Sequence, residues 1–264
     1  MWEKRKPKEP AYICPGLENV GAVYFRTNQF DEASKYFERS LTFAETYKRD
    51  TRRIAKVCLD LGNVRLKQRR FAEAEAFLNR TIQSLQPYPE FDDSILGQAW
   101  NALAQVHFQQ QKWPQAEPCF REAIRLLEPI FGSELPAVIN LYQGLAVVQC
   151  EQEKWDDAEQ ALLQALAKTE KGHGKDNPLF VLGLKNLSAV YGRQNKPDQL
   201  DRLIQQAISI IESAVGPNDV RVAELLEHHA VMLRSFHRSA EAHSLEQRAK
   251  KIRAQAKSPN TENT

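Results

Sequence analysis

The chain has 264 residues, is 42% hydrophobic and 27% charged, and carries a net charge of +2 from 36 basic and 34 acidic residues. This composition is typical of a folded globular protein, and so balanced a charge argues against a nucleic-acid or membrane partner. No apolar run is long enough to span a bilayer. The four cysteines (Cys14, Cys58, Cys119 and Cys150) match no disulfide or zinc spacing, so we expect a cytoplasmic protein.

The first predicted element is a basic arm, residues 1–13, which begins MWEKRKPKEP and lacks the apolar core of a signal peptide. The stretch GLENVGAVYFRTNQFDEASKYFERSLTFAETY follows it, with apolar residues at helical spacing throughout. We predict two helices here with a turn near RTNQF. Asp31 lies near the start of the second helix, where a carboxylate suits the exposed N–H groups.

This helix pair recurs along the chain. A column of small residues in the first helix of each pair is spaced by 41 and then by 42 residues: Gly21, Gly62, Ala104, Ala146, Ser188 and Ala230. Small residues at a fixed position let two packed helices approach closely. Large residues stand in register with them, and this register predicts that Phe30, Phe71, Trp113 and Trp155 are core residues, not platforms for stacking bases. We predict five repeats over residues 14–222.

The linker EKGHGKDNPL, residues 170–179, could be mistaken for a phosphate-binding loop. A P-loop, however, needs Ser or Thr after Gly-Lys and a strand before it, whereas Asp176 follows Lys175 here between two predicted helices. Only Gly174 recurs, since Gly132 and Gly216 lie 42 residues to either side. We expect these glycines to end helices in a left-handed conformation.

The last repeat departs from the pattern. We predict a capping repeat over residues 223–257, because polar residues (His229, Ser239 and Glu246) replace large apolar ones, and terminal repeats need a polar outer face. The tail SPNTENT, residues 258–264, is predicted to be disordered. The adjacent His228 and His229 point about 100° apart on a helix and cannot both face one metal ion. We therefore predict no metal site and no cofactor.

These residues carry a family resemblance. The pattern in WNALAQVHFQQQKWPQAEPCFREAI and LKNLSAVYGRQNKPDQLDRLIQQAI resembles tetratricopeptide (TPR) repeats, and the 42-residue period resembles the kinesin-light-chain-like subclass. The resemblance implies an all-α fold, a right-handed superhelical solenoid of about six antiparallel helix pairs. It also implies that the first helices line a concave groove that binds a partner.

Residues of the first helices carried over from the family pattern form the expected partner-binding groove: Asn19, Arg26, Lys56, Asp60, Asn63, Lys67, Gln98, Asn101, Gln105, Phe108, Asn140, Gln143, Lys185, Asn186 and Arg193. The amides among them can donate to and accept from the backbone of an extended peptide. The clamp that binds chaperone C-termini in this family needs Lys and Asn four residues apart. Leu59 stands four residues before Asn63, so that partner is not expected.

We therefore predict a non-enzymatic adaptor that binds a peptide or protein partner in the concave groove. The alternative is a structural subunit or assembly factor of a larger complex that uses the convex face or the ends of the array. No motif for catalysis occurs in the chain. The sequence does not predict the partner's identity or the oligomeric state.

Overall fold

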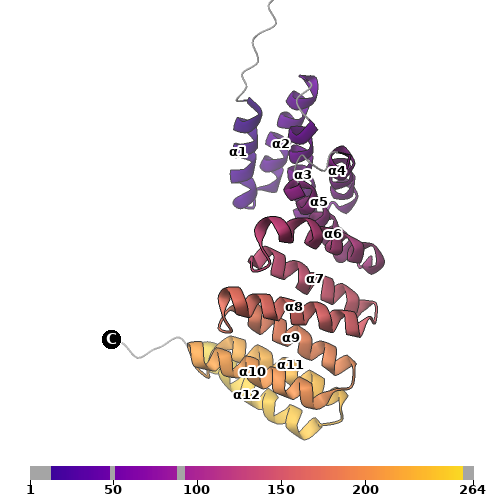
Figure 1. The fold of residues 1–264 in the computed structure, drawn as a ribbon. Helices are drawn as coiled ribbons and strands as arrows, with labels where there is room; N and C mark the ends of the chain where they lie inside the picture. Colours follow the sequence, from indigo (N-terminus) through magenta and orange to yellow (C-terminus); the bar gives the residue numbers. More distant parts are fainter. Residues whose placement is uncertain (1–12, 48–50, 88–92, 258–264) are drawn as a thin grey trace, which may run out of the picture. The chain divides into compact units, whose positions relative to one another are not determined.

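The computed structural model describes residues 13–47, 51–87 and 93–257, and these form helices joined by short turns with no strand (Figure 1). The predicted tail (258–264) and all but the last residue of the predicted arm lie outside the described residues. The predicted all-α fold of helix pairs is confirmed. Its helices are α1 Ile13–Arg26, α2 Phe30–Thr46, α3 Thr51–Lys67, α4 Phe71–Leu85, α5 Asp93–Gln109, α6 Trp113–Phe131, α7 Pro136–Glu151, α8 Trp155–His173, α9 Pro178–Arg193, α10 Pro197–Val215, α11 Val220–Ser235 and α12 Ser239–Lys257.

The chain divides into two compact units, Met1–Ile130 and Phe131–Thr264. In the first unit, successive helices pack on each other from α1 to α5, and α3 also contacts α5. In the second unit, α7 to α12 pack in the same way, and α9 contacts both α7 and α11. The first helices of successive pairs therefore form one layer in each unit. We call this the first-helix layer: α1, α3 and α5 in unit 1, and α7, α9 and α11 in unit 2.

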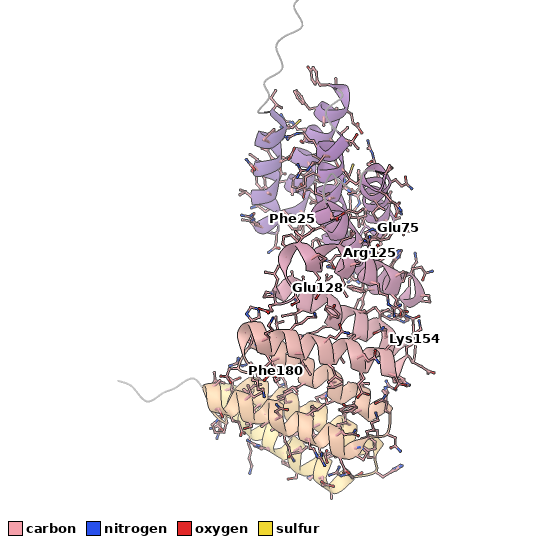
Figure 2. All side chains as sticks on the ribbon, in the orientation of Figure 1. Phe25, Glu75, Arg125, Glu128, Lys154 and Phe180 are labelled. Carbon is pink, nitrogen blue, oxygen red and sulfur yellow. The ribbon has the colours of Figure 1, made fainter. Side chains whose placement is uncertain are left out.

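The small residues predicted to let helices approach are buried, as their positions require. A Cβ added to Gly62 of α3 would lie 2.7 Å from the Leu78 side chain of α4, and one added to Gly21 would lie 2.9 Å from Phe37. Close contact without a side chain on one helix lets the large residue of the other fill the space. Figure 2 shows the side chains of both units and labels Phe25 of α1. The Phe25 ring packs edge-on against Phe30, with ring centroids 5.7 Å apart.

The linker glycines adopt positive φ as predicted, with values of +85° at Gly132, +79° at Gly174 and +98° at Gly216. Their conformation nevertheless differs from the left-handed helical one, because ψ is 170° at Gly174 and 163° at Gly216. This extended region is accessible to glycine almost alone. It turns the chain away from the axis of the helix that ends there.

A second column of positive φ lies in the turn inside each helix pair, and the sequence did not predict it. The φ values of 57° to 61° belong to residues that are not glycine: Asn28, Arg69, Gln111, Glu153, Asn195 and His237. Each of these residues donates its backbone N–H to a carbonyl three residues back, near the end of the preceding helix. The turn is thus fixed by backbone hydrogen bonds and does not depend on one residue type.

The last helix, α12, is polar where the other second helices are apolar. Lys250 is exposed at the position that Ile208 holds in α10, and Glu246 replaces the fully buried Ile204. Such a helix leaves no apolar surface for a further repeat, as a cap requires. The repeat boundaries themselves, including the one at residue 223, stay predictions; α11 begins at Val220.

Candidate partner-binding surface

The predicted groove residues of α5 form one polar stripe. Gln98, Asn101 and Gln105 follow each other at helical spacing, with Gln98 and Gln105 exposed. Gln98 donates to Ser94 Oγ at 3.0 Å, and Gln105 donates to Asn101 Oδ1 at 3.1 Å. These hydrogen bonds join residues four apart on an exposed face, so a peptide backbone can replace them at little cost. Phe108, at the end of the stripe, packs edge-on against Trp113.

On α3 the predicted residues are mostly paired within the helix. Lys56 binds both carboxylate oxygens of Asp60 at 2.7 Å. Burial raises the pKa of Asp60, while Lys56 acts against this rise. Asn63 is half-buried and Lys67 is exposed further along the same helix. The charge available to a partner on this helix is therefore concentrated near Lys67 and the N-terminal end.

A hollow of about 390 Å³ lies between α1, α3 and α5, and we call it the α1–α3–α5 pocket. Glu18 accepts from Arg53 at 3.1 Å and from Ser40 at 3.3 Å, and burial raises its pKa. The lining has three cationic side chains and one carboxylate; Arg53 pairs with Glu18 and Lys56 pairs with Asp60, which leaves a small excess of positive charge for an anionic group. Its lining residues are Glu18, Arg52, Arg53, Lys56, Ser94, Ile95 and Gln98. Asn19 and Arg26 are exposed on α1 and do not line it.

In unit 2 the predicted residues are less uniform. Asn140 and Arg193 are exposed, whereas Lys185 and Asn186 are half-buried. Gln143 is only 5% exposed, and its Nε2 donates to the Leu179 carbonyl at 3.1 Å, which ties α7 to α9. The Gln143 amide therefore holds two helices together, and its Nε2 already has a partner.

The two adjacent histidines of α11 face different helices. His228 lies 3.2 Å from Ser188 Oγ on α9, and His229 lies 2.7 Å from Asp201 on α10. Burial, and then the charges of Lys185 and His229, lower the pKa of His228 to about 4. Ser188 donates its hydroxyl to the Lys185 carbonyl at 2.7 Å, so a neutral His228 can donate its Nε2–H to Ser188 Oγ. Sequence reasoning missed this contact, because Ser188 was assigned only a role as a small residue.

Sequence reasoning also missed an apolar pocket of about 200 Å³ between α9, α10 and α11. Its apolar walls include Val181, Leu182, Ile210, Val215 and Leu225, with charged residues at the rim. Alignment of the repeats could have indicated this pocket. Leu182 and Ile210 stand where the preceding repeat has polar residues, Asn140 and Lys168.

The described residues hold no group of three or more His, Cys, Asp or Glu side chains that could bind a metal ion. Burial raises the pKa of Cys58 and Cys150 to about 11 and that of Cys119 to about 12. These thiols therefore stay protonated at neutral pH and are weak nucleophiles. None of the described helices combines the length and the apolar character needed to cross a membrane.

With this geometry established, comparison with known proteins assigns the family. A family model described as "Tetratricopeptide repeat" matches residues 12–86 and 96–171, more than half of the chain. The chain belongs to the tetratricopeptide repeat family. A search of curated proteins finds no significant match.

Solved structures share this TPR fold at low sequence identity. BtubC (BKLC) from P. vanneervenii is 18% identical with a TM-score of 0.70, over 90% of this chain and 95% of that one. TPR-like repeats of a candidate kinesin light chain from Podospora anserina are 14% identical with a TM-score of 0.67, over 76% and 96%. A Rap protein complexed with Competence and Sporulation Factor is 13% identical with a TM-score of 0.57, over 94% and 76%. The predicted TPR family is confirmed by the family model, and kinesin-light-chain-like repeats are among the structures that share its fold.

Proposed function

We propose that this TPR protein is a non-enzymatic adaptor that binds an extended peptide or protein segment on its first-helix layer. The observation that carries the proposal is the α5 stripe (Gln98, Asn101 and Gln105) beside the cationic α1–α3–α5 pocket. The amides bind the partner's backbone, and the pocket takes an acidic side chain or a terminal carboxylate. The structurally similar Rap protein, whose structure contains Competence and Sporulation Factor, supports this function by analogy only.

The apolar α9–α10–α11 pocket adds a second element of specificity in unit 2. Its volume of about 200 Å³ suits one large apolar side chain of a partner. Lys185, one of the predicted groove residues, lies at its rim beside Arg221 and Glu224. We propose that Leu182 and Val215 contact such a side chain. Asn140, Asn186 and Arg193 contribute polar contacts on the same layer of unit 2.

The test begins with affinity capture by the full chain and mass spectrometry, which identify a partner whose affinity is then measured by calorimetry. The triple variant Gln98→Ala, Asn101→Ala and Gln105→Ala should weaken binding at least about tenfold, since three hydrogen bonds together contribute at least about 1.5 kcal/mol. The control removes three exposed amides from second helices: Gln160→Ala, Gln164→Ala and Gln206→Ala. If the control variant weakened binding of the partner and the α5 variant did not, the proposed binding surface would be refuted.

The second candidate function is that of a structural subunit or assembly factor that uses the convex face or the ends of the array. One observation favours it: Val20 and Val23 of α1 and Tyr47, directly after α2, are exposed apolar residues at the N-terminal end of the described chain. Crosslinking with mass spectrometry separates the two functions. Crosslinks from Lys35 on α2 to a partner would support the second function, and crosslinks from Lys56 and Lys185 would support the first.

A further inference from the structure

Helix α1 leaves open a face that later first helices bury. Val23 is 60% exposed and Val20 is 40% exposed. The residues that take the place of Val23 in the next four repeats are valines that are all fully buried: Val64, Val106, Val148 and Val190. Those that take the place of Val20 are buried leucines: Leu61, Leu103, Leu145 and Leu187. Val20 and Val23 are thus exposed at positions where the other repeats bury an apolar residue. Such an exposed apolar surface can bind another helix.

The exposed face of α1 repeats the side chains of α9. In register, α1 has Gly16, Val20, Val23, Tyr24 and Thr27 where α9 and its following turn have Gly183, Leu187, Val190, Tyr191 and Gln194. In unit 2 this face of α9 is covered by α8, which packs against it. No helix among the described residues of unit 1 fills the equivalent place on α1, and a Cβ added to Gly16 would meet nothing within 4 Å.

The contacts between α8 and α9 show what such a helix must supply. A Cβ added to Gly183 would lie 2.8 Å from the side chain of Leu166, so this leucine fills the space that glycine leaves. Tyr191 donates its hydroxyl to Glu159 at 3.0 Å. Gln194 donates to Asp156 at 3.1 Å. The covering helix thus runs antiparallel to α9, with acids at its N-terminal end and a leucine near its middle.

Arg39 of α2 indicates a further requirement. In register with it, Arg80 of α4 pairs with Glu45 of the preceding second helix at 2.5 Å. Arg248 of α12 pairs in the same way with Glu212 of α10. Arg39 lies over the Tyr36 ring, 5.7 Å from its centre. An acid near the C-terminal end of an added helix would therefore complete the ion pair that recurs at this position.

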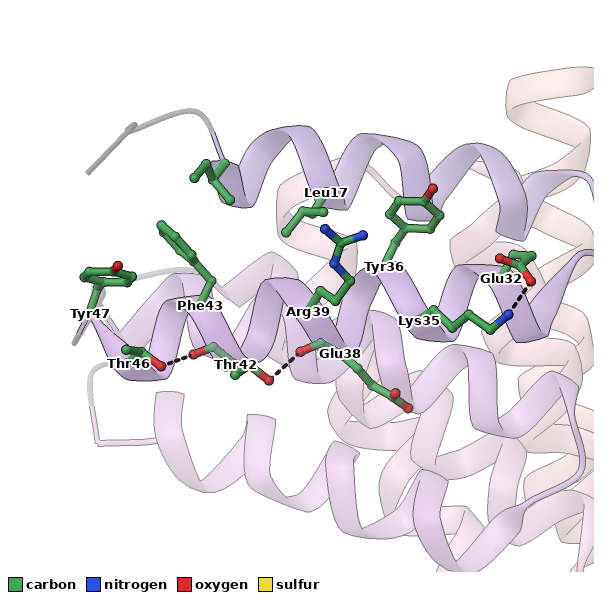
Figure 3. A pocket seen from close by; sticks show the side chains of 11 residues that line it. Leu17, Glu32, Lys35, Tyr36, Glu38, Arg39, Thr42, Phe43, Thr46 and Tyr47 are labelled. Atoms are coloured by element: carbon green, nitrogen blue, oxygen red, sulfur yellow. Dashed lines mark hydrogen bonds and ion pairs between the residues drawn. The ribbon is translucent and has the colours of Figure 1, made fainter. Parts of the chain in front are cut away.

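Figure 3 shows the space that this helix would enter, a hollow of about 880 Å³ between α1 and α2. Leu17 comes from α1, Tyr36, Arg39 and Phe43 come from α2, and Tyr47 directly follows α2. The Phe43 and Tyr47 rings lie 4.5 Å apart at one end of the hollow. The aromatic lining can bury a large apolar area against a partner.

We infer that the open face of α1 and the adjoining hollow bind an amphipathic, acidic α-helix of another protein. The helix runs antiparallel to α1 and places a leucine opposite Gly16. A glutamate seven residues before that leucine meets Tyr24, and a glutamate four residues after it meets Arg39, as Glu159, Leu166 and Glu170 are spaced in α8. This inference does not depend on the proposed groove.

Two other occupants fit less well. The sequence of residues 1–12 includes Pro7 and Pro10, which argue against this segment as the covering helix. A second copy stacked by its C-terminal end would present Lys250 at the position of Leu166, and Lys250 cannot fill the space beside Gly16. A helix of α8 type supplies both the leucine and the acids.

The probe is a synthetic peptide of residues 154–173, which contains α8, titrated into the full chain and followed by fluorescence polarisation. Saturable binding is expected, and Val23→Glu should weaken it at least about tenfold, because burying a valine contributes roughly 1.5–3 kcal/mol. The matched control is Val231→Glu on α11, since Val231 is also 60% exposed, and it should change the affinity less than about twofold. Equal effects of the two variants, or no saturable binding at about 1 mM peptide, would overturn the inference.

Two further measurements identify other occupants. In a Val23→Cys variant, the new thiol should react rapidly with a maleimide and be protected by the peptide; a thiol unreactive in the free chain would show that the chain covers this face itself. Light scattering should give the Val23→Glu variant the same oligomeric state as the wild-type protein. A wild-type dimer that this variant makes monomeric would show that a second copy is the occupant, and would likewise overturn the inference.

Discussion

Replacing His228 with glutamine should make the stability of unit 2 less dependent on pH. The folded-state pKa of His228 is about 4, below the ordinary value of 6.5, chiefly because the ring is buried. Between these values the unfolded chain binds a proton that the folded chain does not. The free energy of unfolding therefore falls as pH falls below 6.5, and at pH 5 the loss is at most about 2 kcal/mol. Because the ring is partly exposed, we expect roughly 1–2 kcal/mol.

Urea unfolding followed by circular dichroism at pH 7.5 and pH 5.0 measures this loss. The groups that face His228 are Ser188 and Lys185 on α9 and its neighbour His229. Glutamine does not titrate and keeps an N–H donor for the Ser188 hydroxyl oxygen, whose own proton goes to the Lys185 carbonyl. The variant should therefore lose less stability than wild type between the two pH values, whereas His243→Gln, at an exposed position of α12, should not. An unchanged loss in His228→Gln would refute the assignment of this pH dependence to His228.

Glycine substitutions test the backbone and the packing. Gly174→Ala should lower the free energy of unfolding by about 1–3 kcal/mol, because φ is +79° and ψ is 170° there, and thermal melts would show no change if this backbone were relaxed. Gly16→Ala, in a helix with open space around the added Cβ, should instead raise it by roughly 0.5–1 kcal/mol. Gly62→Ala should cost about 1–3 kcal/mol by overpacking Leu78, and the same substitution should cost less in a Leu78→Ala background; a neutral single variant would contradict the close approach of α3 and α4.

The sequence was sufficient to predict the helix pairs, because one column of small residues repeats with a nearly constant period. The same column explains why boundaries were predictable: α1 ends at Arg26 and α2 begins at Phe30, on either side of the expected turn. Pro114 is the second residue of α6, where a missing donor does little harm. Pro118 and Pro129 lie inside the same helix, and the repeat pattern did not predict that α6 would continue through them.

The candidate site was harder to predict, because burial between repeats depends on neighbours that a single sequence position does not reveal. Gln143 and Asn101 occupy equivalent positions and have similar side chains. Asn101 nevertheless lies in an exposed stripe, whereas Gln143 is buried against the carbonyl of Leu179. The division of the chain near residue 130 is likewise invisible in the sequence, since the 42-residue period continues through it.

The polar contacts between successive pairs bear on how the chain avoids folding in the wrong order. Arg65 of α3 is buried and binds Ser34 and Glu38 of α2 as well as Glu73 of α4, whereas Tyr191 of α9 binds Glu159 of α8. Pairs that look alike in their apolar columns therefore differ in the partners they need. A pair that skipped its neighbour during folding would keep Arg65 bound to Glu73 but would lose the bonds of Arg65 to Ser34 and Glu38. The different polar partners required at each interface therefore favour the native succession of the repeats.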